Sequence, residues 1–322
     1  MADVVCLGDL LIDFVPTVTG KGLADAPAFV KAPGGAAANV AVGLTRLGAT
    51  SAFLGKVGDD PFGHFLADTL AGEGVDVGGL RFETRARTAL AFVSLRADGE
   101  REFLFYRHPS ADMLFTPAEV DAERIAAARI FHFDSISLAA EQPRATALHA
   151  AGLARQGGKL VSYDVNLRLP LWPDAEAAKA GILLGLRQAQ IAKLSDDELD
   201  FLTGTRAPEA VRDQLWHADL QLMVLTMGGQ GSILITPEGQ RHVPSIKVTP
   251  VDTTGAGDGF VAGLLAGLLP HPTLPNLDHL TPICQFANAV GAMTTLGRGA
   301  IPALPDHAAV RRLLAEHGAT EL

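Results

Sequence analysis

Residues 252–258, which read DTTGAGD, combine groups that bind an anion with a group that accepts a proton. An apolar run follows them and predicts a helix. The backbone N–H groups of Gly255, Ala256 and Gly257 would be free at the helix start, where no side chain blocks a phosphate group. The carboxylate of Asp258 would lie in the first turn and accept the proton of an attacking hydroxyl group. Taken alone, the stretch fits a helix cap equally well.

Two stretches near the start of the chain place polar groups in apolar surroundings. Asp9 and Asp13 are carboxylates that need partners if they are buried, and the hydroxyl groups of a polyol would be suitable partners. Gly34 and Gly35 precede a predicted helix of small residues that carries Asn39. Close approach of this backbone to a polyol and tight helix packing are both open interpretations.

Two further stretches follow predicted strands. Asp164, Asn166 and Arg168 alternate along the chain, so their side chains would share one face at the carboxyl edge of a sheet, although a surface ion pair is a fair alternative. Residues 226–231, TMGGQG, would form a backbone cradle or a plain β-turn.

Other nucleotide-binding motifs are missing from the sequence. No lysine is followed by Ser or Thr, which excludes the P-loop. The protein-kinase catalytic loop is also missing. The glycines of residues 255–259 do not fit GxGxxG, so an NAD-dependent oxidoreductase is not supported. A nucleotide would have to bind in another way.

The composition indicates an ordinary globular chain, because 48% of its 322 residues are hydrophobic. A formal net charge of −10 argues against nucleic acid and anionic membranes as partners. Cys6 and Cys284 lie in apolar stretches without disulfide or zinc spacing. The first residues do not form a basic secretory signal, and the longest apolar run, 260–269, is too short to span a bilayer. We expect a cytoplasmic protein with small-molecule partners.

Short β-branched runs alternate with Ala- and Leu-rich segments, which is typical of an α/β sandwich with a mostly parallel central sheet. Strands are predicted at 4–8, 51–57, 130–134, 160–164, 191–194, 222–226 and 232–235. Helices are predicted at 36–47, 62–72, 142–156, 175–187, 255–269 and 280–296.

Residues 14–33 and 88–107 break this alternation. The second segment predicts a β-hairpin with its turn at 97–100, because Asp-Gly is a turn signal. We expect both segments to form a small β lid over the carboxyl edge of the sheet, where open α/β sheets bind ligands. The whole chain, residues 1–322, would be one domain.

Together these stretches resemble the ribokinase-like (PfkB) carbohydrate kinase family over essentially the whole chain. GGAAANVA and DTTGAGD are similar to its two signature regions. REFLFYRHPSADM at 101–113, SYDVNLRLPLW at 162–172 and GAIPALP at 299–305 resemble the plant-type fructokinase branch. The resemblance implies a three-layer ribokinase-like sandwich with a β lid, and ATP as the phosphoryl donor.

The resemblance also implies residue roles. Asp258 would be the catalytic base, with an anion hole at Gly255, Ala256 and Gly257. The sugar would be held by Asp9, Asp13, Gly34, Gly35 and Asn39, with Phe105, Arg107 and Arg168 closing over it. The residues for ATP would be Thr226, Gly228, Gly229, Gly231 and Asn288. Lys193, at the end of a predicted strand, is a further single candidate for ATP. For Lys193 and Asn288 taken alone, a structural role is the more common explanation.

Two kinds of metal ion follow from the resemblance. Magnesium would accompany the nucleotide, helped indirectly by Glu198 of an Asn-x-x-Glu motif in which Ser195 replaces the Asn. Asp252 and Thr254 match part of a monovalent-cation site, which would hold potassium.

The resemblance implies phosphorylation of D-fructose by ATP. An alternative is 2-keto-3-deoxygluconate kinase, since Arg107 and Arg168 could pair with a sugar-acid carboxylate. Another small-sugar kinase, or a sugar-binding protein without turnover, is a further alternative. A homodimer through the lid is also expected.

Overall fold

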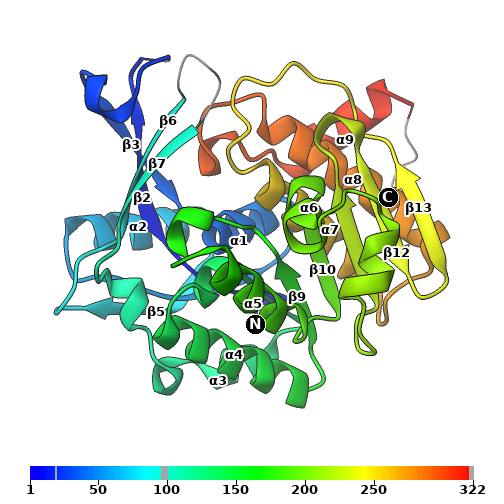
Figure 1. Ribbon diagram of the computed structural model, residues 1–322, viewed down its shortest axis with the longest axis horizontal. Helices are drawn as coiled ribbons and strands as arrows, with labels where there is room; N and C mark the ends of the chain where they lie inside the picture. The colour runs from blue at the N-terminus through cyan, green and yellow to red at the C-terminus, as the bar shows by residue number, and fades with distance from the viewer. Residues whose placement is uncertain (19, 96–100, 319–322) are drawn as a thin grey trace.

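The computed structural model describes residues 1–18, 20–95 and 101–318 (Figure 1). Among these residues, nine strands form one sheet in the order β13-β12-β11-β10-β9-β8-β1-β4-β5. Neighbouring strands are parallel except at one edge, where β11, β12 and β13 pair antiparallel. The strands are β1 (Val4–Leu7), β4 (Ser51–Gly58), β5 (Asp76–Glu83), β8 (Ile130–Asp134), β9 (Leu160–Asp164), β10 (Ile191–Ser195), β11 (Leu222–Thr226), β12 (Ser232–Thr236) and β13 (Gly239–Val243).

Side chains point alternately to the two faces of the sheet along each strand, and helices cover both faces. In β1, Val4 and Cys6 are part of one buried core, whereas Val5 and Leu7 are part of the other. The first core is closed by α1 (Ala36–Arg46), α2 (Pro61–Gly72), α7 (Ala256–Leu268), α8 (Leu277–Thr294) and α9 (His307–Glu316). The second is closed by α3 (Ala122–Ala127), α4 (Glu141–Gln156), α5 (Ala175–Leu186) and α6 (Asp196–Thr203). The predicted three-layer α/β sandwich is confirmed.

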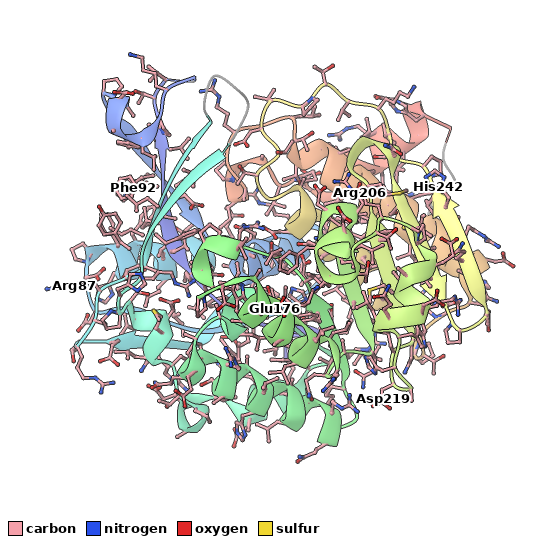
Figure 2. The ribbon with its side chains drawn as sticks, in the orientation of Figure 1. Arg87, Phe92, Glu176, Arg206, Asp219 and His242 are labelled. Carbon is pink, nitrogen blue, oxygen red and sulfur yellow. The ribbon has the colours of Figure 1, made fainter. Side chains whose placement is uncertain are left out.

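A small second sheet projects from the sandwich at the upper left of Figure 1. Its order is β3-β2-β6-β7, with β2 (Leu11–Pro16), β3 (Phe29–Gly34), β6 (Leu90–Leu95) and β7 (Arg101–Tyr106). The predicted hairpin strands, β6 and β7, pair antiparallel, and the predicted turn lies outside the described residues. Phe92 points outward from this lid (Figure 2). Its ring stacks on that of Phe14, with the ring centroids 4.8 Å apart. The ring of Phe14 in turn contacts that of Phe62 in α2, which joins the lid to the sandwich.

All seven predicted strands lie within one residue of their predicted bounds. Two edge strands were not predicted: β5 contains two glycines and β13 is largely polar, so neither shows an apolar pattern. Helix α8 begins three residues earlier than predicted, because Asn276 caps its start. Pro282 therefore lies inside the helix.

Candidate functional site

A cleft of about 860 Å³ lies between the lid and the carboxyl ends of the central strands. Ser195 and Thr226, which end β10 and β11, line its sheet side, while Val93 and Phe105 line its lid side. The predicted site residues that line it are Asp9, Asp13, Gly35, Asn39, Phe105, Arg168, Lys193, Glu198, Thr226, Asp252, Thr254, Gly255, Gly257 and Asp258. The structure therefore brings together most residues of the predicted site.

The N-terminus of α7 lies at this cleft. Gly255 precedes the helix with φ at 77°, and a Cβ there would lie 2.5 Å from that of Ala300, so glycine is required. The amides of Gly255 and Gly257 have no acceptor among the described residues. The amide of Ala256 donates to the carbonyl oxygen of Thr253 at 3.3 Å. Two of the three predicted amide donors are thus available to an anion, and Ala256 is used within the turn.

Asp258 lies in the first turn of α7 and is only 7% exposed. Nδ2 of Asn39, in α1, donates to Oδ2 of Asp258 at 2.7 Å. Burial raises the pKa of Asp258 to about 6, although the hydrogen bond from Asn39 lowers it. A carboxylate with this pKa is mostly ionised at neutral pH and is a much better proton acceptor than an ordinary aspartate.

Asp9 and Asp13 lie next to the tight Gly-Gly turn that precedes α1. The amide of Ala36 donates to Oδ1 of Asp9 at 3.2 Å. A Cβ on Gly34 would lie 2.1 Å from Oδ2 of Asp13, and a Cβ on Gly35, with φ at 116°, would lie 2.3 Å from the carbonyl oxygen of Asp9. Burial and the charge of Asp9 raise the pKa of Asp13 to about 7. The two glycines thus let the backbone pass directly beside both carboxylates.

A row of buried charges crosses the sheet beneath the cleft. Strand register aligns Asp134 of β8 with Asp164 of β9, and Asp164 with Lys193 of β10. Nζ of Lys193 lies 3.0 Å from Oδ1 of Asp164. Burial, and then the charge of Asp9, raises the pKa of Asp134 well above its usual range. Asp134 was not among the predicted site residues, although its place at a strand end next to Asp164 was a usable signal.

Arg168 brings a positive charge into the cleft. Arg168 lines the same cleft as Asp13 and Asp258, and its charge lowers the pKa values of both carboxyl groups. Its Nη1 donates to the backbone carbonyl of Leu167 at 3.0 Å. Arg168 and the carboxylates of Asp9 and Asp13 thus line one cleft.

Arg107 lies elsewhere than expected. Arg107 is 7% exposed and forms an ion pair with Asp112. It lies behind Asp9 and is not among the described residues that line the cleft. Arg107 does not line the described part of the cleft, so its closing over a ligand stays a prediction. The sequence could not reveal this pairing, because many acidic side chains were equally available to Arg107.

Four of the predicted nucleotide residues also lie outside the described wall of the cleft. The side chain of Asn288 is buried and accepts from Ser232, while its Nδ2 donates to the carbonyl oxygen of Val243 at 3.1 Å. Direct contact of Asn288 with a ligand is not supported, because its polar atoms tie α8 to β12 and β13. The other three are Gly228, Gly229 and Gly231, in the exposed turn after β11.

Glu198 caps the start of α6. Its two carboxylate oxygens accept from the amides of Leu167 and Ser195, at 2.8 and 2.6 Å. The amide of Glu198 in turn donates to Oγ of Ser195, which completes a capping box. No cluster of three or more His, Cys, Asp or Glu in the described part of the chain could hold a metal ion by itself.

Asp252 joins two loops at the rim of the cleft. Its Oδ1 accepts from the amide and hydroxyl of Thr254, at 3.0 and 2.7 Å, and its Oδ2 accepts from the amide of Gly299 at 3.0 Å. Both carboxylate oxygens of Asp252 therefore accept hydrogen bonds that tie residues 252–254 to Gly299.

A family model described as "pfkB family carbohydrate kinase" matches residues 1–307. The chain belongs to this family. Among similar proteins, "Probable fructokinase-7" of Arabidopsis thaliana is 55% identical over 97% of this kinase and 92% of the relative. Fructokinase with bound ATP from Xylella fastidiosa aligns with a TM-score of 0.90 and 34% identity, over 99% of this kinase and 100% of that chain. A fructokinase double mutant from Vibrio cholerae O395 in a fructose, ADP and potassium ion bound form aligns with a TM-score of 0.86 and 36% identity, over 98% of each chain.

In the described part of this carbohydrate kinase, no helix is both long and apolar enough to cross a membrane.

Proposed function

We propose that this carbohydrate kinase transfers the γ-phosphoryl group of ATP to the primary hydroxyl group of D-fructose, which yields fructose 6-phosphate and ADP. The observation that carries the proposal is the position of Asp258, buried at the N-terminus of α7 beside the amides of Gly255 and Gly257. The similar proteins named fructokinase, including one with fructose and ADP bound, support fructose as the acceptor.

In the proposed reaction, Asp258 removes the proton of the primary hydroxyl group as its oxygen attacks the γ-phosphorus. The bond from that phosphorus to the bridging oxygen of ADP breaks, and ADP leaves with the bonding electrons. Negative charge that develops on the phosphoryl oxygens faces the amides of Gly255 and Gly257, which need no reorganisation. The lid excludes water, which limits wasteful hydrolysis of ATP.

The sugar would lie against Asp9, Asp13 and Asn39, since carboxylate and amide groups suit several hydroxyl groups at once. Arg168 would lie beside it, Phe105 would cover it from the lid, and Gly34 and Gly35 would shape its pocket. Arg107 would act from behind Asp9.

ATP would lie toward Lys193 and Thr226, with Gly228, Gly229 and Gly231 forming a backbone edge and Asn288 supporting that edge indirectly. Magnesium would be held chiefly by the phosphates, and Glu198 would orient its water ligands. Asp252 and Thr254 would hold potassium close to the anion hole and stabilise the loop before α7.

The arrangement of arginines favours fructose over 2-keto-3-deoxygluconate. Arg168 faces the cleft, but Arg107 is already paired with Asp112 and does not offer a free fork to a carboxylate. A sugar-binding protein without turnover is disfavoured because the proton acceptor and its anion site are both intact.

We also propose that the lid and the sandwich form one domain over residues 1–322, and that the lid, at about 14–33 and 88–107, carries a homodimer contact. Val30, Leu104 and Tyr106 of the lid expose 59%, 47% and 57% of their surface, and a contact with a second copy would bury them. Sedimentation at micromolar concentration tests the contact, and a monomer would contradict it. The expected cytoplasmic location is likewise a proposal, which cell fractionation tests.

The direct test measures ADP release with Mg-ATP against fructose, 2-keto-3-deoxygluconate, ribose and adenosine in parallel. The proposal predicts the highest kcat/KM for fructose. A higher value for any of the other three would replace fructose as the substrate, and release of ADP with none of them would contradict the proposed activity.

A further inference from the structure

Arg107 and Asp112 form a buried ion pair at the base of the lid. The pair joins the end of β7 to the short turn Ala111–Leu114, and its side chains are only 8% and 6% exposed. Nη2 of Arg107 donates to Oδ2 of Asp112, and the hydroxyl of Ser110 donates to Oδ1. Both carboxylate oxygens of Asp112 are therefore used to hold one orientation of the pair.

The pair lies directly behind Asp9. A cavity of about 20 Å³ is lined by Asp9, Arg107, Asp112 and Ser137, and Asp9 also lines the large cleft. Nε of Arg107 is buried without an acceptor among the described residues. Burial raises the pKa of Asp9, the charge of Arg107 lowers it and the charge of Asp112 raises it. The charge on Asp112 is thus felt at the wall of the cleft.

We propose that Asp112 is a specificity-determining residue, which neutralises Arg107 so that the cleft accepts a neutral ketose and rejects a sugar acid. The inference rests on the proposed function and deepens it. Asp9, Arg107 and Asp112 together carry a formal charge of −1. Asp13 and Asp258 add two carboxylates to the cleft and Arg168 adds one positive charge, so the formal charge of the set stays negative. An acidic sugar would meet repulsion at this wall, whereas the hydroxyl groups of a ketose would find hydrogen-bond acceptors.

Loss of the charge on Asp112 would make the net charge around Asp9 less negative without removing any group from the wall of the cleft. Arg107 would then counter Asp9 fully, and its unpaired guanidinium would attract a sugar-acid carboxylate. An ion pair that only stabilises the turn Ala111–Leu114 would affect both sugars alike. The ratio of the two kcat/KM values therefore separates a role in specificity from a role in stability.

The experiment measures kcat/KM for fructose and for 2-keto-3-deoxygluconate in the wild type and in Asp112→Asn, which keeps the shape of the side chain. We expect the ratio of sugar acid to fructose to rise on the order of tenfold, since one charge is removed close to the site. Asp112→Glu keeps the charge and should retain a ratio close to that of the wild type.

The matched control is Asp219→Asn, which removes another carboxylate that pairs with an arginine, Arg155. Asp219 lies at the lower right of Figure 2, at the opposite end of the molecule from the lid. This variant should leave both the ratio and the basal activity unchanged. If Asp112→Asn does not fold, Ser110→Ala weakens the same pair and should shift the ratio in the same direction by a smaller factor.

An unchanged ratio in Asp112→Asn, or in Ser110→Ala where that variant is needed, overturns the role of Asp112 while fructose remains the substrate. A wild-type enzyme that prefers the sugar acid overturns the proposed function itself, and the inference with it. The two failures are therefore distinguishable from one set of measurements.

Discussion

Replacement of Asn39 by alanine is expected to move the acid limb of the turnover profile to higher pH. Nδ2 of Asn39 donates to Oδ2 of Asp258 at 2.7 Å inside the buried site. A hydrogen bond to a charged group contributes about 1.5–3 kcal/mol, and about 1.4 kcal/mol corresponds to one pKa unit. Loss of the bond therefore raises the pKa of Asp258 from about 6 to about 7–8.

The acid limb moves to higher pH because Asp258 acts as a base, and only its ionised form can accept a proton. At pH 7 the ionised fraction would fall from about nine-tenths to between about one-half and one-tenth. The assay follows ADP release between about pH 5.5 and pH 9 with saturating fructose and Mg-ATP, so that weaker sugar binding does not contribute.

The matched control is Thr45→Val in the same helix, because the hydroxyl of Thr45 bonds only the carbonyl oxygen of Val42 and lies outside the described lining of the cleft. Its profile should coincide with that of the wild type. If Asn39→Ala instead lowers turnover by one constant factor across the whole range, the hydrogen bond does not tune Asp258 and the reasoning is refuted.

Three further predictions concern stability. Asp258→Asn should raise the free energy of unfolding by about 2–3 kcal/mol above pH 6, because it removes a buried carboxylate whose pKa is raised by burial to about 6. This gain in stability should vanish below about pH 4, and a gain that persists there would contradict the prediction. Gly35→Ala should lower the free energy of unfolding in urea by at least about 2 kcal/mol, because φ is 116° and the new Cβ would clash with the backbone of Asp9. Gly152→Ala in α4 is the control, since its Cβ would meet nothing within 4 Å and the free energy of unfolding should not fall. Equal losses in the two variants would refute the steric argument. Potassium chloride should raise the melting temperature more than sodium chloride if Asp252 and Thr254 hold potassium, and the difference should disappear in Asp252→Asn.

Local sequence signals were sufficient for seven of the nine described strands of the central sheet and for α7. Buried parallel strands need continuous apolar runs, and a helix that binds an anion needs small residues at its start, so both leave a direct trace in the sequence. Strands β5 and β13 leave no such trace, because one face of each edge strand is exposed and their residues include glycines or polar side chains. Their place is set by pairing with a neighbouring strand.

The site residues that lie close to the end of a strand or the start of a helix were predictable from the sequence. Asp9, Asp13, Asn39 and Asp258 meet at the cleft for this reason. The partner of Arg107 was not predictable, because it depends on which of many carboxylates the folded chain brings within reach. The same holds for Asn288, whose hydrogen bonds are to groups 44 or more residues away along the chain.

The most direct test of the account is turnover and fructose binding in Asp258→Asn. The variant keeps the size of the side chain but cannot accept the proton of the hydroxyl group. We expect kcat to fall by roughly 10² to 10⁴, while calorimetric affinity for fructose stays within a few fold of the wild type. Near wild-type kcat in a folded variant would contradict the assignment of Asp258 as the base, and with it the proposed reaction.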